Sequence, residues 1–224
     1  MHARDREGLA PEVFRSLREQ GYAHLQKSFD LECFRSLASE IGHVVAEEPI
    51  ALRDGAHAYV AKPGPVPLHT DQAQVEIVGW HCQEQDEHDG ASLLLDSQVV
   101  LGAMHGSDRE ALRRLRLACP PVAGGPPTMA VPVLRSLRGR ELFFCSPWLT
   151  PVDEGHCQKA TIRRLWRSIK DACAQSLVRV RLAAGDALFV DNQRVLHGRR
   201  SIPANSRRRL RRAWVITRET ARLE

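Results

Sequence analysis

From residue 43 onward, the chain consists largely of short apolar runs that are interrupted by Gly and Pro. Such runs are typical of β-strands, and they lack the regular alternation with helices that a parallel α/β fold requires. The expected strands are residues 43–45, 58–61, 74–82, 92–95, 177–182, 187–190 and 210–218, with a possible hairpin of 129–134 and 141–145. The fold is therefore predicted to be mainly β, as a barrel or a sandwich with helices around it.

The helices are expected near the N-terminus and in one insertion. Residues 10–20 carry apolar side chains at helical spacing, and Asp30 is a candidate N-cap for a helix that ends at Gly42. Between these two helices, residues 22–25 are predicted to be a strand. Further helices are expected over 97–117, with an interruption near Gly106, and over 158–175. We thus predict a helical N-terminal cap of about 8–42 and an insertion of about 97–175.

The length and composition favour one globular domain over residues 1–224. The chain has 43% hydrophobic and 26% charged residues, which is ordinary for a globular protein. No apolar stretch is long enough for a membrane span, and the first twenty residues are too charged for a signal peptide, so a cytoplasmic location is expected. The six cysteines are scattered singly, which predicts small core residues rather than disulfides.

The formal charge of +5 is unevenly distributed, because seven arginines lie within residues 199–212. Such a cluster can bind nucleic acid, form a solvated face, or place a carboxylate-binding strand inside a pocket. For Arg199, Arg200 and Arg211 we expect solvated side chains.

Three residues suggest a metal site. His69 and Asp71 are two positions apart, so in an extended segment their side chains emerge on the same face. His197 follows a short predicted strand and completes a set of two imidazoles and one carboxylate. This donor set is the one that holds non-haem Fe(II) and leaves coordination positions open. A zinc cluster of His81, Cys82 and His88 is disfavoured, because no fourth ligand stands at a suitable spacing.

The chain resembles the TauD/TfdA-like Fe(II)/2-oxoglutarate dioxygenases, in particular the branch of γ-butyrobetaine hydroxylase and clavaminate synthase. The resemblance lies in the order and context of several segments: LHTD at 68–71, VGWHC at 78–82, DGASLLLD at 89–96, GD at 185–186, DNQRVLHGR at 191–199 and RRRLRRAWVIT at 207–217. It spans residues 68–217, with only a loose match over 100–180.

The resemblance implies a double-stranded β-helix, or jelly-roll barrel, and assigns roles to individual residues. His69, Asp71 and His197 would be the iron ligands. Ser92 and Arg208 would bind the distal carboxylate of 2-oxoglutarate. Strand alternation places Arg212 on the same side as Arg208, where it could meet a second carboxylate or the substrate. A slip of one position to Arg207 or Arg209 stays open, although strand alternation turns those two away from whatever Arg208 faces.

Two other polar residues match the family pattern without an expected catalytic role. For Asp96 and Asn192 we expect structural hydrogen bonding. The aromatic residues Trp80, Phe143, Phe144 and Trp148 either line a pocket or, as scattered aromatics more often do, serve in ordinary packing.

The implied reaction is the oxidation, by default hydroxylation, of a small polar substrate such as an amino acid or carboxylate, with release of succinate and CO2. Its cofactors would be Fe(II), 2-oxoglutarate and O2. One alternative is a nucleic-acid demethylase of the AlkB type, which would use the basic stretch to hold phosphates, and another is an inactive barrel that only binds a ligand. The sequence leaves the substrate and the oligomeric state open.

Overall fold

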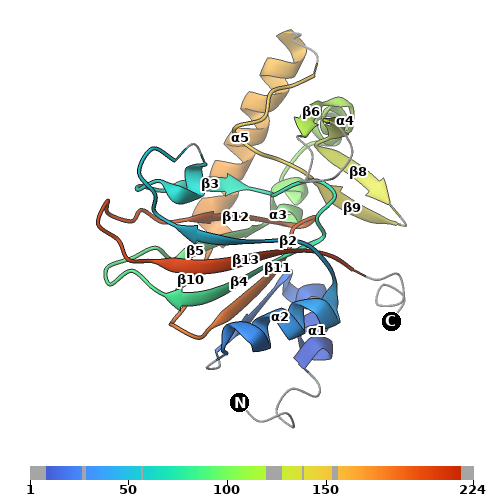
Figure 1. Ribbon diagram of the computed structural model, residues 1–224. Helices are drawn as coiled ribbons and strands as arrows, with labels where there is room; N and C mark the ends of the chain where they lie inside the picture. The colour runs from blue at the N-terminus through green and yellow to red at the C-terminus, as the bar shows by residue number, and fades with distance from the viewer. Residues whose placement is uncertain are drawn as a thin grey trace.

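Two antiparallel sheets form the centre of the molecule, in a computed structural model that describes residues 9–26, 29–56, 58–119, 128–137, 139–152 and 156–217. The five-stranded sheet has the order β1 (Tyr22–Leu25), β11 (Ala187–Asp191), β4 (Ile77–Glu84), β13 (Arg209–Thr217) and β2 (Gly42–Ala51). The four-stranded sheet has the order β10 (Val178–Val180), β5 (Ser92–Asp96), β12 (Val195–Arg199) and β3 (Val66–His69). The prediction of a mainly β fold with flanking helices is confirmed (Figure 1).

Alternation along the strands builds the layers, because successive side chains point to opposite faces of a sheet. Leu188 and Val190 of β11 pack with Leu94 and Val195 of the other sheet, so they fill the space between the two sheets. Ala187 and Phe189, which alternate with them in β11, face the other way and pack against the N-terminal helices. The two sheets therefore lie face to face, with a shared interior.

Helices cover the outer faces of both sheets (Figure 1). The N-terminal helices α1 (Leu9–Gln20) and α2 (Leu31–Ile41) pack on the five-stranded sheet, and Asp30 caps α2 as predicted. The long helix α5 (His156–Ser176) packs with α3 (Ser97–Gly102) against the outer side of the four-stranded sheet, through Leu165, Ile169, Leu95 and Leu196, and α4 (Gly106–Arg114) packs against α5.

Three local expectations differ from the structure. Residues 58–61 contain the short 3-10 helix η2 (Tyr59–Ala61) instead of a strand. The helix expected to reach residue 117 ends at Arg114, and the chain continues as β6 (Arg116–Cys119). β6 pairs with β7 (Met129–Pro132), so the hairpin is formed by β8 (Leu134–Leu137) and β9 (Arg140–Phe143) alone. The pairing of β6 with β7 depends on contacts between segments that are distant in the sequence, so local sequence patterns do not predict it.

Within the described ranges, no helix combines the length and apolar character that crossing a bilayer would demand.

Gly198 allows β3 to approach β12 closely, and this approach can be tested. A Cβ atom at Gly198 would lie 2.7 Å from the backbone oxygen of Val66, a contact that backbone atoms cannot relieve cheaply. We expect Gly198→Ala to lower the free energy of unfolding by about 1–3 kcal/mol, measured by urea denaturation. Gly106→Ala is the matched control, since a Cβ there meets nothing within 4 Å. Equal stabilities of the two variants would contradict this account of the strand packing.

Candidate metal centre and its two cavities

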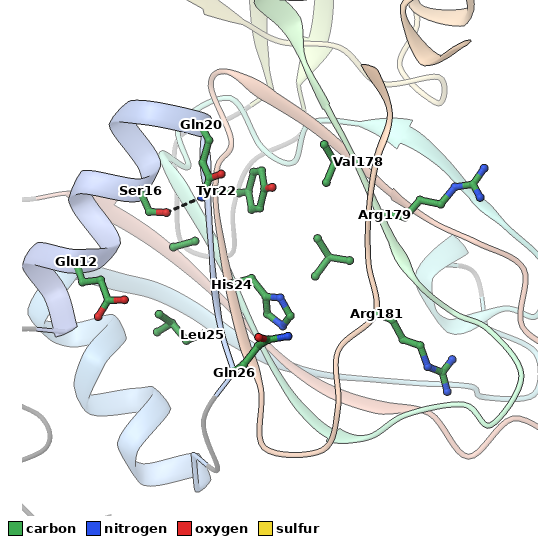
Figure 2. A pocket seen from close by; sticks show the side chains of 12 residues that line it. Glu12, Ser16, Gln20, Tyr22, His24, Leu25, Gln26, Val178, Arg179 and Arg181 are labelled. Atoms are coloured by element: carbon green, nitrogen blue, oxygen red, sulfur yellow. Dashed lines mark hydrogen bonds between the residues drawn. The ribbon is translucent and has the colours of Figure 1, made fainter. Parts of the chain in front are cut away.

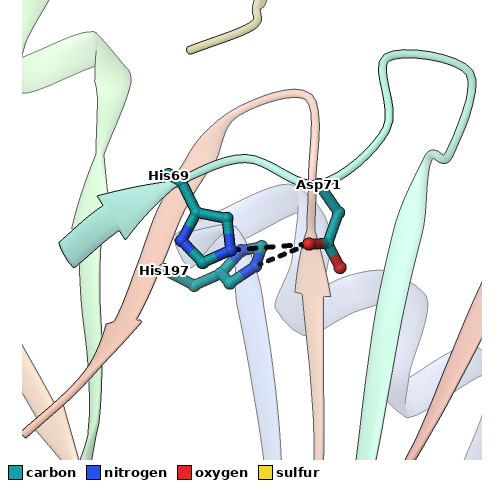
Figure 3. Close-up of side chains that lie close together, drawn as sticks. All are labelled: His69, Asp71 and His197. Carbon is teal, nitrogen blue, oxygen red and sulfur yellow. Dashed lines mark ion pairs between the residues drawn. The ribbon is translucent and has the colours of Figure 1, made fainter. Parts of the chain in front are cut away.

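The structure brings His69, Asp71 and His197 together in the interior. His69 ends β3 and lies opposite His197 of β12 in the antiparallel register, while Asp71 follows two residues later in the chain. One potential ligand atom from each residue lies within 4.8 Å of the others, and all three residues are buried (Figure 3). Asp71 Oδ1 is 3.5 Å from His69 Nε2 and 3.7 Å from His197 Nε2. The three atoms thus converge on one point.

The surroundings of the two imidazoles leave their Nε2 atoms available to a ligand. His69 Nδ1 lies 2.9 Å from the carbonyl oxygen of Pro67. A carbonyl only accepts hydrogen bonds, so Nδ1 carries a proton, and Nε2 is the ring nitrogen that faces Asp71. Neither ring nitrogen of His197 has a hydrogen-bond partner among the described residues, although both are buried. A buried imidazole without partners is costly unless something else binds it.

The Asp71 carboxylate is fixed from the side opposite the histidines. The Nη1 atom of Arg212 donates to both carboxylate oxygens, at 3.2 and 2.9 Å, and the indole Nε1 of Trp214 donates to Oδ2 at 2.7 Å. Arg212 is in turn paired with Glu48. Because Oδ2 is held in this way, Oδ1 remains directed at the two imidazoles.

The electrostatics of the cluster favour the metal-binding protonation states. Burial alone would raise the pKa of Asp71, but the Arg212 guanidinium and the imidazoles of His197 and His69 lower it well below its usual range. Burial, with a further contribution from the nearby His69, lowers the pKa of His197. At neutral pH the cluster therefore presents an ionised carboxylate and, at His197, a neutral imidazole, as metal ligation requires.

Asn192 fixes the segment that carries Asp71. Its side-chain oxygen accepts a hydrogen bond from the backbone N–H of Asp71 at 2.7 Å, and its amide nitrogen donates to the carbonyls of Gln72 and Val75. Asp96 accepts from the backbone N–H of Gln98 at the start of α3 and from the guanidinium of Arg194. The prediction of structural hydrogen bonding by Asn192 and Asp96 is confirmed.

A narrow cavity of about 50 Å³ lies beside the two histidines. It is lined by His69, His197, Trp80, Ser92, Arg199, Arg208 and Arg212, with aliphatic side chains from both sheets. Arg208 is buried, whereas Arg207 and Arg209 are exposed, as the predicted strand alternation requires. The sequence-predicted residues Ser92, Arg208 and Arg212 therefore share one cavity with the histidines.

Arg208 is a buried cation without a carboxylate partner in the described structure. Its side chain donates from Nε to the Oε1 atom of Gln85 at 3.0 Å. Burial, with the nearby positive charge of Arg199, lowers the pKa of Arg208 to about 10. A buried guanidinium that has only a neutral partner is well placed to receive an anion.

The expectation that Arg199 is solvated is wrong. Arg199 is 5% exposed, and its guanidinium donates to the backbone carbonyls of Val60, Lys62 and Gly64. It thereby ties the segment around η2 to the strand that carries His197. Arg200 and Arg211 are less buried and pair with Asp89 and Glu47.

A wider cavity of about 300 Å³ lies on another side of the cluster and shares Val60, His69 and Arg212 with the narrow one. Its lining comes from η2, the end of β3, the segment after β9, and β13: Ala58, Tyr59, Val60, His69, Thr70, Asp71, Gln72, Phe144, Ser146, Trp148, Leu149, Arg212 and Trp214. We name these the narrow cavity and the wide cavity. Of the four aromatics considered from the sequence, Trp80 lines the narrow cavity, Phe144 and Trp148 line the wide one, and Phe143 packs in the core.

A third cavity, of about 460 Å³, is lined by none of the three candidate metal ligands. It lies between α1, β1 and β10, and its polar lining includes Glu12, Ser16, His24 and Arg179 (Figure 2). None of the sequence-predicted site residues borders it. Its volume alone therefore does not make it the candidate site.

The disfavoured zinc cluster also finds no support. The group of potential metal ligands found in the described ranges is His69, Asp71 and His197. His81 is instead buried against Phe34, and its Nε2 lies 2.9 Å from the carbonyl oxygen of Phe29.

The sequence matches the family described as "Taurine catabolism dioxygenase TauD, TfdA family" over residues 13–214. The chain belongs to the TauD/TfdA family of dioxygenases. This confirms the resemblance found in the sequence, and with it the enzyme class of non-haem Fe(II)/2-oxoglutarate-dependent dioxygenases. The assignment to the γ-butyrobetaine hydroxylase branch stays a prediction. Among curated proteins, no match was found.

Solved structures of oxygenases share the fold. An asparagine oxygenase in complex with Fe(II), hydroxyasparagine and succinate has a TM-score of 0.75 at 18% identity, with 93% of this chain and 79% of that chain covered. The non-heme iron oxygenase OrfP, in complex with Fe and α-ketoglutaric acid, has a TM-score of 0.72 at 14% identity, with 95% and 80% covered. PvcB from Pseudomonas aeruginosa has a TM-score of 0.69 at 21% identity, with 94% and 81% covered. At these identities the likeness establishes a common fold.

The sequence reasoning did not find Trp214, Glu48 or Gln85. Trp214 had a usable signal, because it lies at the same alternation parity on β13 as Arg208 and Arg212. Glu48 and Gln85 reach the site through strand pairing and a loop, and no local pattern marks either of them.

The role of Asn192 can be tested by its removal. We expect Asn192→Ala to lower the free energy of unfolding by about 3 kcal/mol, because the buried N–H of Asp71 and two carbonyls lose their partner. Asn205→Ala, at an exposed position, is the matched control. Urea denaturation measures both, and an Asn192→Ala protein as stable as the control would refute this role.

Proposed function

We propose that this dioxygenase binds Fe(II) through His69, Asp71 and His197, and that it couples the oxidation of 2-oxoglutarate to hydroxylation of a small carboxylate such as an amino acid. The convergence of the two Nε2 atoms and Asp71 Oδ1 on one point carries the proposal. We further propose that residues 1–224 act as one domain and that the two sheets are those of a jelly-roll barrel.

The residues present fit an iron ion. Two imidazoles and one carboxylate are the donor set of non-haem Fe(II) sites, and the buried ring nitrogens of His197 have no other partner in the described structure. Bound iron would supply the activation of dioxygen, and the overall reaction would convert substrate, 2-oxoglutarate and O2 into hydroxylated substrate, succinate and CO2. The chain's own contribution is to keep Asp71 ionised and His197 neutral, and to hold all three ligands buried and aimed at one point.

The narrow cavity suits the cosubstrate. Arg208 offers a guanidinium without a carboxylate partner, and the Ser92 hydroxyl borders the same space, so both can hold a distal carboxylate. Since the cavity measures about 50 Å³, its lining side chains must move apart to admit a five-carbon diacid. In the described structure Arg208 has one side-chain partner, the neutral amide of Gln85. Replacing this hydrogen bond with one to the carboxylate of the diacid therefore costs little free energy.

The wide cavity suits the substrate, because it reaches His69 and Asp71 from a different side than the narrow one. The asparagine oxygenase and OrfP structures contain hydroxylated amino acids, which supports an amino acid or a related carboxylate as the substrate here. Arg212 borders both cavities and is the cation nearest to such a carboxylate.

The arrangement of the arginines disfavours a nucleic-acid demethylase. Arg199, Arg208 and Arg212 point inward and are 5–8% exposed, so these members of the basic cluster do not form a phosphate-binding surface. The inactive-barrel alternative is disfavoured because all three candidate ligands are present and converge. The cytoplasmic location remains a prediction from the sequence.

Succinate release tests the cosubstrate assignment. Purified protein with Fe(II), ascorbate, oxygen and a pool of amino acids is expected to convert 2-oxoglutarate to succinate, and His69→Ala is expected to reduce this to background. Arg208→Ala is expected to raise the KM for 2-oxoglutarate about tenfold to a hundredfold, the cost of one charge-assisted contact. Arg207→Ala is the adjacent control, because Arg207 is exposed. Equal KM values for the two arginine variants would reject Arg208 as the cosubstrate ligand.

Trp214 is expected to act through Asp71 on metal affinity. Trp214→Phe keeps a ring but removes the N–H that holds Asp71 Oδ2, so we expect the dissociation constant for Fe(II), titrated without oxygen, to rise about tenfold. Trp166→Phe, on α5 and away from the cluster, is the control. An unchanged dissociation constant would show that the indole N–H does not orient the carboxylate.

A further inference from the structure

Four aromatic residues line the wide cavity: Tyr59, Phe144, Trp148 and Trp214. The rings of Tyr59 and Trp148 stack with centroids 4.7 Å apart and planes at 22°. Trp148 also meets His69 edge-on, with centroids 4.7 Å apart, so this aromatic wall reaches one of the proposed metal ligands. Phe144 and Trp214 line the same space. A planar apolar group entering the cavity therefore meets ring faces and edges, the geometry that aromatic pairs prefer.

Three polar residues on the walls have hydrogen-bond partners within the protein. The Thr70 hydroxyl exchanges hydrogen bonds with the backbone of Cys145, and the Gln72 side-chain oxygen accepts from the Cys119 thiol. Ser146 accepts from the backbone N–H of Trp148. The Thr70 hydroxyl and the Gln72 side-chain oxygen are therefore less available to a polar substrate side chain than free groups would be.

The charged residues that line the wide cavity also restrict which substrate side chains can bind. Of the described residues that line the wide cavity, Asp71 is the one carboxylate, and Arg212 and Trp214 hold its Oδ2 while Oδ1 faces the histidines. A cationic substrate side chain thus has no acid to pair with. The cation on the wall, Arg212, is itself paired with Asp71 and Glu48, so neither Asp71 nor Arg212 is left for a charged side chain to pair with.

We propose that the substrate is a carboxylate, amino acids included, whose remaining part is flat and uncharged, such as an aromatic ring. This inference rests on the proposed function and narrows it. It separates this chain from the structurally similar oxygenases that were solved with hydroxyasparagine and hydroxyarginine.

The test compares ligands on protein loaded with Fe(II) and 2-oxoglutarate in the absence of oxygen. Calorimetric titration is expected to give dissociation constants for L-phenylalanine and 3-phenylpropionate that are at least tenfold lower than those for L-arginine and L-asparagine. Stronger or equal binding of arginine or asparagine would overturn the proposal, as would the absence of binding by both aromatic probes. Binding of Fe(II) and 2-oxoglutarate is measured in the same samples, and its failure would instead overturn the proposed function.

A variant pair assigns the selectivity to the aromatic wall. Tyr59 is 49% exposed, so Tyr59→Ser is expected to fold normally and to weaken binding of the tighter aromatic probe about fivefold, with 2-oxoglutarate affinity unchanged. Leu137→Ser, at a residue that is 51% exposed on the β8–β9 hairpin, is the matched control and is expected to bind like the parent protein. Equal affinities of the two variants for that probe would contradict a role of this wall in recognition.

Discussion

The antiparallel pairing of β3 with β12 is the constraint on which the site depends. It places His69 opposite His197, and the chain then needs only two further residues to bring Asp71 to the same point. Gly198 permits the close approach of these strands, and Asn192 fixes the segment beyond β3 by binding the backbone of Asp71. The ligand geometry is therefore a property of the sheet and of one buried amide.

The three buried arginines differ in their partners, and these differences determine which ligands each cavity can bind. The pair of Arg212 and Asp71 keeps the candidate metal ligand ionised and oriented. Arg199 is compensated by backbone carbonyls and Arg208 by one neutral amide, so the narrow cavity retains positive charge that an anion would neutralise. The wide cavity has four aromatic residues in its lining, and its charged residues Asp71 and Arg212 are paired with each other, so a charged side chain finds neither of them free.

Much of this site followed from local sequence patterns. The spacing of His69 and Asp71 predicted convergence in an extended segment, and alternation separated Arg208 from its exposed neighbours. The burial of Arg199 was not predictable, because its partners are carbonyls from residues 60–64, which only the tertiary fold brings near β12. The 3-10 conformation of η2 was missed for a related reason, since an apolar run of that length fits either a strand or a turn of helix.

The central claim is that His69, Asp71 and His197 hold one iron ion. The most direct measurement is an anomalous difference map at the iron edge, from crystals grown without oxygen in the presence of Fe(II) and 2-oxoglutarate. The account predicts a peak in contact with the Nε2 atoms of both histidines and with an oxygen of Asp71, next to density for the diacid near Arg208. A map without a peak at this position, or with iron bound elsewhere, would contradict it.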